Sequence, residues 1–223
     1  KKSFSAAELQ RQLGHKRYEP IWTLLHKLRE IMGKRDEIYS LSGVIELDEG
    51  FFSTETPDDE KKKPLKRGRG SQKKSKVLVM AESQPVEGQT TKSGKPRQVG
   101  HIKMIVINDL KSETITSLAE NNITKESTID SDDSTSYVKL KDIVKEHRPQ
   151  VIPKEEIGKV LPWVHIAISN AKRMLLDIYH DIKPEYLQNY LNEFCYKFNR
   201  RYFGENLFDR LMIASVTYKN QFR

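Results

Sequence analysis

Two aspartates, Asp48 and Asp132, stand where a carboxylate is uncommon. Asp48 is embedded in the apolar run of residues 44–52, and Asp132 closes a shorter run at 128–132. A carboxylate inside a strand is costly to bury unless it is paired, hydrogen-bonded or bound to a metal ion. Two aspartates that converge from neighbouring strands suit Mg²⁺, which takes one or two carboxylates together with water and phosphate oxygens. We therefore expect metal-assisted displacement at phosphorus.

Each aspartate also has an ordinary structural interpretation. Asp132 begins the polar run 132–134, which can cap a helix that follows it. Asp130 and Asp133 are alternatives to Asp132 as the second site residue. Glu49 adjoins Asp48, but alternation along a strand predicts that it points to the opposite face of the sheet. Spacing alone leaves the metal-site and capping interpretations open.

The elements that must position these residues predict an α/β fold. Strands are expected at 44–52, 76–81, 101–108, 128–132 and 151–152, and helices at 112–120, 137–146 and through the remainder of the chain. Three consecutive strands followed by alternating helices and strands indicate a mixed sheet flanked by helices. We expect the catalytic domain to cover residues 43–223.

Residues 1–42 are predicted to form a small helical region. Ser5 lies three residues before Glu8, which is the spacing of a capping box, and Pro20 suits the first turn of a second helix. Apolar residues recur at helical spacing from Ile21 to Met32. The pair can be a helix-turn-helix that contacts DNA, or a hairpin that packs on the next domain.

A strongly basic tract lies in the predicted loop at residues 53–76. Its cationic residues are Lys61, Lys62, Lys63, Lys66, Arg67, Arg69, Lys73 and Lys74. The tract has no apolar period, so a solvated loop is the ordinary interpretation. It joins two strands of the expected sheet, which tethers its charge close to the aspartates. With a formal net charge of +8 for the chain, this placement favours contact with DNA phosphates.

Composition narrows the class of protein further. A single cysteine, Cys195, makes neither an internal disulfide nor a cysteine-rich zinc site. No apolar run approaches the length of a membrane span, and the first residues lack the apolar stretch of a signal peptide. We expect a cytoplasmic protein, associated with the nucleoid when it is bound to DNA. The first residue is not Met, so a natural start upstream is expected.

Three segments resemble the bacterial insertion-sequence transposases of the DDE type that are related to Merlin transposons (ISXO-like). Residues 43–49 resemble the strand with the first catalytic aspartate, and Asp132 lies five residues before Tyr137, as in that family. From Trp163 to Arg201 the chain is similar to the C-terminal signature of the family, with Tyr179-His180, a Tyr-Leu-x-Glu-Phe-like run at 190–194, and Asn-Arg-Arg at 199–201. The resemblance implies an RNase H-like fold.

The third metal position departs from the family pattern. In that pattern a Glu precedes a helical Lys by seven residues, and the Lys precedes the Tyr-His histidine by eight. Counting back from His180 gives Lys172 and then His165 in place of Glu. Asn170, a residue type that replaces the Glu in some relatives, is the rival, although it lies only two residues before Lys172. We expect His165 to complete a site for Mg²⁺, or for Mn²⁺, which suits imidazole better.

The resemblance implies a DNA transposase that cleaves transposon ends and transfers strands to target DNA, acting as a homo-oligomer on DNA. Asp48 and Asp132 would hold the metal, and Lys172 and Arg173 would contact phosphate. Two alternatives remain open: a catalytically inactive DNA-binding derivative, and an RNase H-like nuclease without strand transfer.

Overall fold

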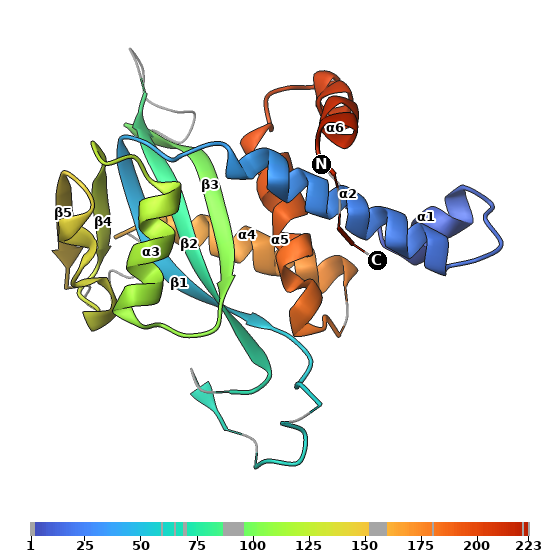
Figure 1. The fold of residues 1–223 in the computed structure, drawn as a ribbon, viewed down its shortest axis with the longest axis horizontal. Coiled ribbons are helices and arrows are strands. Elements are labelled where there is room, and N and C mark those ends of the chain that lie inside the picture. Colours follow the sequence, from blue (N-terminus) through green and yellow to red (C-terminus); the bar gives the residue numbers. More distant parts are fainter. Residues whose placement is uncertain are drawn as a thin grey trace.

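The computed structural model describes residues 3–58, 60–64, 66–68, 71–86, 96–151, 160–179, 181–219 and 221–222. Two N-terminal helices precede a five-stranded sheet whose strands are interleaved with helices (Figure 1). The elements are α1 (Ala6–Gln12), α2 (Glu19–Glu37), β1 (Val44–Ser53), β2 (Lys74–Pro85), β3 (Arg97–Ile107), α3 (Ser112–Asn122), β4 (Thr128–Asp132), the 3₁₀ helices η2 (Thr135–Tyr137) and η3 (Leu140–Asp142), β5 (Glu146–Gln150), α4 (Pro162–Ile178), α5 (Pro184–Asn199) and α6 (Asn206–Thr217).

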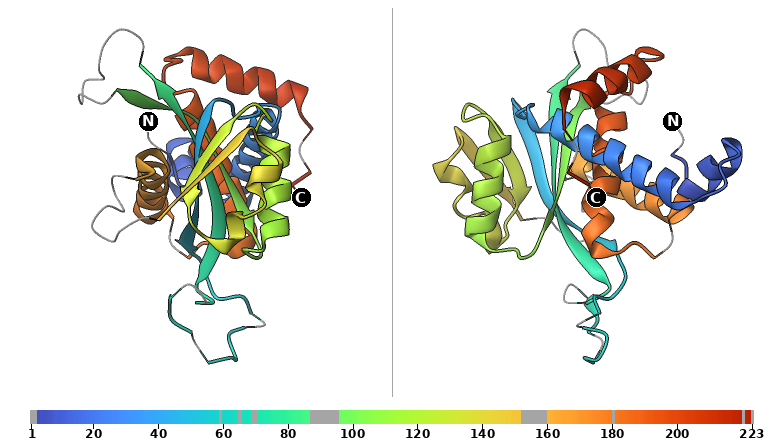
Figure 2. Two further views of the ribbon diagram at one scale, coloured as in Figure 1. Left: turned by 90° about the vertical axis from the view of Figure 1, so that its left-hand side faces the viewer. Right: turned by 45° about the vertical axis from the view of Figure 1, so that its right-hand side comes forward.

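The sheet has the strand order β3-β2-β1-β4-β5. The first three strands along the chain pair antiparallel, whereas β4 runs parallel to both β1 and β5. Helix α3 covers one face of the sheet and helices α4 and α5 cover the other (Figure 2). The prediction of an α/β fold with a mixed sheet flanked by helices is confirmed, and the architecture is RNase H-like.

The core has two layers because side chains alternate along the central strands. On β1, Ile45 and Leu47 are fully buried and pack with α3, Tyr137 and η3, whereas Phe52 packs with α4 and α5 on the opposite face. Asp48 belongs to the α4 face by the same alternation. The central strand therefore carries the site between two well-packed layers.

Two predicted elements around residues 137–152 are wrong. The helix expected at 137–146 is replaced by η2 and η3, and the last predicted strand lies earlier in the chain, as β5. Val151 follows that strand, and residue 152 lies outside the described residues. Strand β2 also begins at Lys74, so the end of the predicted basic loop belongs to the sheet.

The N-terminal helices pack on the rest of the protein. Ser5 caps α1 by accepting a hydrogen bond from the Glu8 N–H at 3.1 Å, as its spacing predicts. Helix α2 lies along α5, where buried Arg29 pairs with Glu193 at 2.8 Å. This is the packing that the hairpin alternative describes, and DNA contact by this region stays a prediction. Among the described residues, no helix is both long and apolar enough to cross a membrane.

Candidate active site

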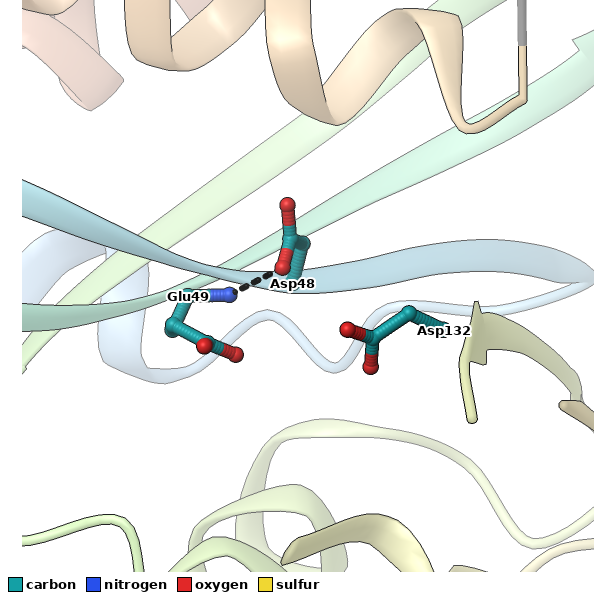
Figure 3. A group of neighbouring side chains, drawn as sticks. All are labelled: Asp48, Glu49 and Asp132. Carbon is teal, nitrogen blue, oxygen red and sulfur yellow. Dashed lines mark hydrogen bonds between the residues drawn. The ribbon is translucent and has the colours of Figure 1, made fainter. Parts of the chain in front are cut away.

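Asp48 and Asp132 meet because β1 and β4 are parallel neighbours. The last paired residues of the two strands are Leu47 and Ser131. Asp48 and Asp132 are the residues that directly follow this pair on the two adjacent strands. Carboxylate oxygens of Asp48, Glu49 and Asp132 all lie within 4.8 Å of one another (Figure 3). Strand β4 ends at Asp132, whose side chain is partly exposed at this end of the sheet.

The capping interpretation of Asp132 is partly correct. Its Oδ1 accepts a hydrogen bond from the Ser134 N–H at 3.2 Å, but Ser134 itself is the N-cap of η2. The neighbouring acids differ in placement: Asp133 is exposed, and Asp130 lies partly buried further back on β4. Of the three acids, only Asp132 belongs to the cluster with Asp48 among the described residues.

Glu49 is the residue of this cluster that the sequence interpretation left out. It does leave β1 in the direction opposite to Asp48, as alternation predicts, yet its carboxylate remains close to both aspartates (Figure 3). The buried hydroxyl of Tyr137 donates a 2.6 Å hydrogen bond to Glu49 Oε2. No local spacing pointed to this contact, because Glu49 and Tyr137 lie 88 positions apart in the sequence.

His165 approaches the same aspartate from α4. Its Nδ1 lies 3.7 Å from Asp48 Oδ2, and its Nε2 is buried with no hydrogen-bond partner in the part of the chain described. Burial lowers the pKa of His165, which favours the neutral ring that binds metal ions. Asp48 Oδ1 meanwhile accepts a hydrogen bond from the Glu49 N–H at 2.8 Å. The two oxygens of Asp48 thus face different neighbours.

A second carboxylate pair lies two residues behind the first on the same strands. Glu46 and Asp130 are register partners on β1 and β4, and Asp130 Oδ1 is buried without a hydrogen-bond partner among the described residues. Burial raises the pKa of Glu46 to about 7, although the backbone N–H groups of Val164 and Trp163 favour its carboxylate form. Burial also raises the pKa of Asp130.

The cationic residues of α4 lie on different sides of the helix. Lys172 extends over Phe52, with Nζ 5.6 Å from the ring centre, and lines a cavity with Lys74. Burial, with a contribution from Lys74, lowers the pKa of Lys172. Asn170 and Arg173 instead line a separate cavity beside α1 and α5. His165, and not Asn170, is therefore the residue placed beside Asp48.

The basic tract extends from the sheet as the connection between β1 and β2 (Figure 1). Its described cations are exposed, and two of them make local ion pairs: Lys61 with Asp58 at 2.5 Å, and Lys63 with Glu60 at 3.9 Å. The side chain of Gln72 bridges the tract by bonding to Lys66 N and Pro64 O. Arg69, predicted to contact DNA, lies outside the described residues, as does His180.

Residues of the C-terminal signature have intramolecular partners. Asn199 bonds to both backbone groups of Ile102, and Arg200 pairs with Asp36 at 2.6 Å. Arg201 donates to the carbonyl oxygens of Gly100 and Val99. These contacts fasten the end of α5 to β3 and α2, so this part of the signature is explained by the architecture.

Comparison with protein families decides the class. Residues 40–199 match the ISXO2-like transposase domain, which includes the whole sheet and helices α3 to α5. The chain belongs to this transposase family. A search of curated proteins found no match to the chain. The suspected insertion-sequence family is thereby confirmed.

The donor set at the sheet end fits a divalent cation. Hard cations prefer oxygen ligands, and three carboxylates lie within 4.8 Å of one another there. Three like charges at this separation repel unless a cation or protons offset them. The half-buried His165 ring adds a nitrogen donor on the α4 side of Asp48. This transposase chain therefore has the ligand types that the predicted metal site requires.

Proposed function

We propose that the protein cuts the ends of a mobile DNA element and joins them to target DNA by metal-dependent phosphoryl transfer. The observation that carries the proposal is the meeting of Asp48 and Asp132 at the ends of adjacent parallel strands, with His165 at 3.7 Å from Asp48. The family match to a transposase domain supports the same reaction class.

Asp48 and Asp132 are the residues that would hold Mg²⁺ or Mn²⁺ in this proposal, and His165 would complete the site. A bound divalent cation supplies charge stabilisation at the phosphorus and a more acidic water or 3′-hydroxyl. His165 would serve as a neutral nitrogen ligand, since its burial disfavours the protonated ring. Glu49, held by Tyr137, is the rival for this third position.

Lys172 and the basic tract would hold the DNA backbone. Lys172 and Lys74 line one cavity, and two ammonium groups in one cavity suit the binding of a phosphate group. The exposed lysines between β1 and β2 and Arg173 would add sequence-independent affinity that weakens with salt. Members of this class join paired DNA ends, so we propose a homo-oligomer on DNA.

A strand-joining assay tests this function. Duplexes that carry the inverted repeats flanking the gene are incubated with a target plasmid and with Mg²⁺ or Mn²⁺. Wild type is compared with Asp48→Ala, His165→Ala, Asn170→Ala and Glu49→Gln. We expect cleavage and joining by wild type and by Asn170→Ala, and neither reaction by Asp48→Ala.

The outcomes separate the alternatives. Cleavage without joining would identify a nuclease, and DNA binding without cleavage in either metal would identify an inactive derivative. Full activity of His165→Ala together with loss of activity in Glu49→Gln would place the third ligand on the Tyr137 side. Full activity of His165→Ala with an inactive Asn170→Ala would instead favour Asn170.

A further inference from the structure

Helix α4, which carries His165, is not capped by the side chain of its own N-cap residue. Its N-cap residue is Leu161, which adopts a left-handed backbone conformation with φ 55° and ψ 49° and has no side chain able to accept a hydrogen bond. The first N–H groups of any helix lack partners inside the helix. Pro162 has no N–H to satisfy, so Trp163 and Val164 are the first residues that need an acceptor.

Glu46 of β1 supplies that acceptor from the face of the sheet that α4 covers. Its Oε2 accepts hydrogen bonds from Trp163 N at 2.7 Å and Val164 N at 3.0 Å. Glu46 is only 5% exposed, so these bonds are shielded from water and are correspondingly strong. A single carboxylate oxygen thus joins the third residue of β1 to the first turn of α4.

The contact of Glu46 with Val164 and the contact of Asp48 with His165 follow each other in the same order along β1 and α4. Glu46 and Asp48 are two residues apart and face the same side of the sheet, roughly 7 Å from each other along the strand. On the helix, Val164 bonds to Glu46, and the next residue, His165, faces Asp48. Any shift of the helix end relative to Glu46 therefore moves the imidazole relative to Asp48.

We propose that Glu46 is a positioning residue of the active site, which caps α4 so that His165 is held against Asp48. The functional consequence depends on the metal site proposed above, but the positioning itself does not. A Ser, Thr or Asp at the N-cap would satisfy the same donors locally. The acceptor comes instead from the strand that carries Asp48, beside the partly buried Asp130.

The test separates the reach of the side chain from its charge. Glu46→Gln keeps the length and an acceptor oxygen but removes the charge, whereas Glu46→Asp keeps the charge and is one methylene too short. Ser5→Ala, which removes the cap of the distant helix α1, controls for the loss of a helix cap in general. The first readout is the NMR chemical shift of the His165 ring in metal-free protein, assigned with His165→Ala.

We expect Glu46→Asp to shift the ring signals, and Glu46→Gln and Ser5→Ala to leave them near their wild-type positions. In end cleavage, Glu46→Asp should lose roughly 10- to 100-fold, as misplacement of a catalytic group by about 1 Å does, and Glu46→Gln should restore most of the rate. Wild-type ring signals in Glu46→Asp would overturn the proposal, and so would equal shifts in the Gln and Asp variants.

The ring signals are read without metal or DNA, so they test positioning independently of the reaction. A second readout is the broadening of the His165 signals by Mn²⁺, expected in wild type and Glu46→Gln and reduced in Glu46→Asp. Absence of broadening in wild type would count against the proposed metal site alone. Undiminished broadening in Glu46→Asp would count against the proposal that Glu46 positions His165.

Discussion

Two regions of the molecule gather charged side chains in opposite ways. Between α2 and α5, Glu193 is matched by two cations: Arg29 at 2.8 Å and Lys197 at 2.5 Å. At the end of β4, three carboxylates lie within 4.8 Å of one another. Opposite charges satisfy each other inside the fold, whereas like charges raise its energy until a ligand offsets them. The first arrangement stabilises the fold and the second suits a ligand.

Removal of one carboxylate from the cluster should have the largest effect on activity. Asp48→Asn should lower end cleavage by at least about 10³-fold, because a proposed metal ligand is lost. The same change should leave the unfolding temperature unchanged or raise it, since repulsion among like charges falls. Strand-cleavage rates and thermal unfolding measure the two effects.

The matched control is Asp133→Asn, which alters an exposed acid next to the cluster. Asp133→Asn should change neither the rate of end cleavage nor the unfolding temperature appreciably. A large loss of stability in Asp48→Asn would show that the cluster is structural, and the contrast between the two regions would fail.

The converse experiment removes one partner of the buried ion network. Arg29→Met should lower the free energy of unfolding by about 3–5 kcal/mol, because Glu193 loses its buried partner. Cleavage per folded molecule should be retained. Urea unfolding gives the stability, and Lys139→Gln, which breaks an exposed pair with Glu113, is the control with little expected effect.

The buried ion pair of Glu193 should also make the stability of the fold depend on pH. Burial by itself raises the pKa of Glu193, but Arg29 and Lys197 outweigh it and hold the pKa below the ordinary 4.5. A carboxylate with a depressed pKa stabilises the fold above its unfolded-state value, and this stability is lost as the pH falls through the folded-state value. The stability difference between wild type and Glu193→Gln should therefore shrink from pH 5 to pH 3. A constant difference in urea midpoints would contradict this expectation.

The smallest predicted effect concerns two neighbouring lysines, Lys172 and Lys74. Lys172 and Lys74 line one cavity, so Lys172→Ala should weaken DNA binding only a few-fold at about 0.1 M salt. The slope of log affinity against log salt should become shallower by about one, the contribution of one phosphate contact. Fluorescence anisotropy across a salt series measures it, with Lys141→Ala on η3 as control. An unchanged slope would remove Lys172 from the DNA contacts.

Much of the sheet could be predicted from the sequence because the central strands are apolar and bounded by polar loops. The strand at 128–132 matches the prediction, and the first three strands are longer than predicted at one or both ends. Strand β5 escaped prediction because its residues, Glu146–Gln150, are polar and include a proline. An edge strand tolerates both, since only one side of it must pair.

For the candidate site, the sequence indicated single residues in separate segments but not the contacts between those segments. Asp48 stood out as a carboxylate within an apolar strand and Asp132 as the end of a short predicted strand, whereas His165 remains a prediction from the resemblance, by counting back from His180 and Lys172 along the family pattern. The roles of Glu46 and Glu49 depend on contacts with residues about 90 to 120 positions away, namely Tyr137, Trp163 and Val164. Periodicity and local spacing describe neighbours along the chain, so such contacts become visible only when the sheet and helices are packed.

The indole of Trp163 gives the α4 cap a spectroscopic consequence. The chain has two tryptophans: Trp163 bonds through Nε1 to Ser83 Oγ at 3.1 Å beside the Glu46 cap, and Trp22 lies in an aromatic cluster with His26 and Phe222. Each therefore samples one of the two regions compared above. With Trp22 replaced by Phe, the remaining fluorescence would report on changes around the α4 cap, including any caused by the proposed metal or DNA. With Trp163 replaced, the remaining fluorescence would report on the packing of α2, so the two single-tryptophan proteins would follow the two regions separately.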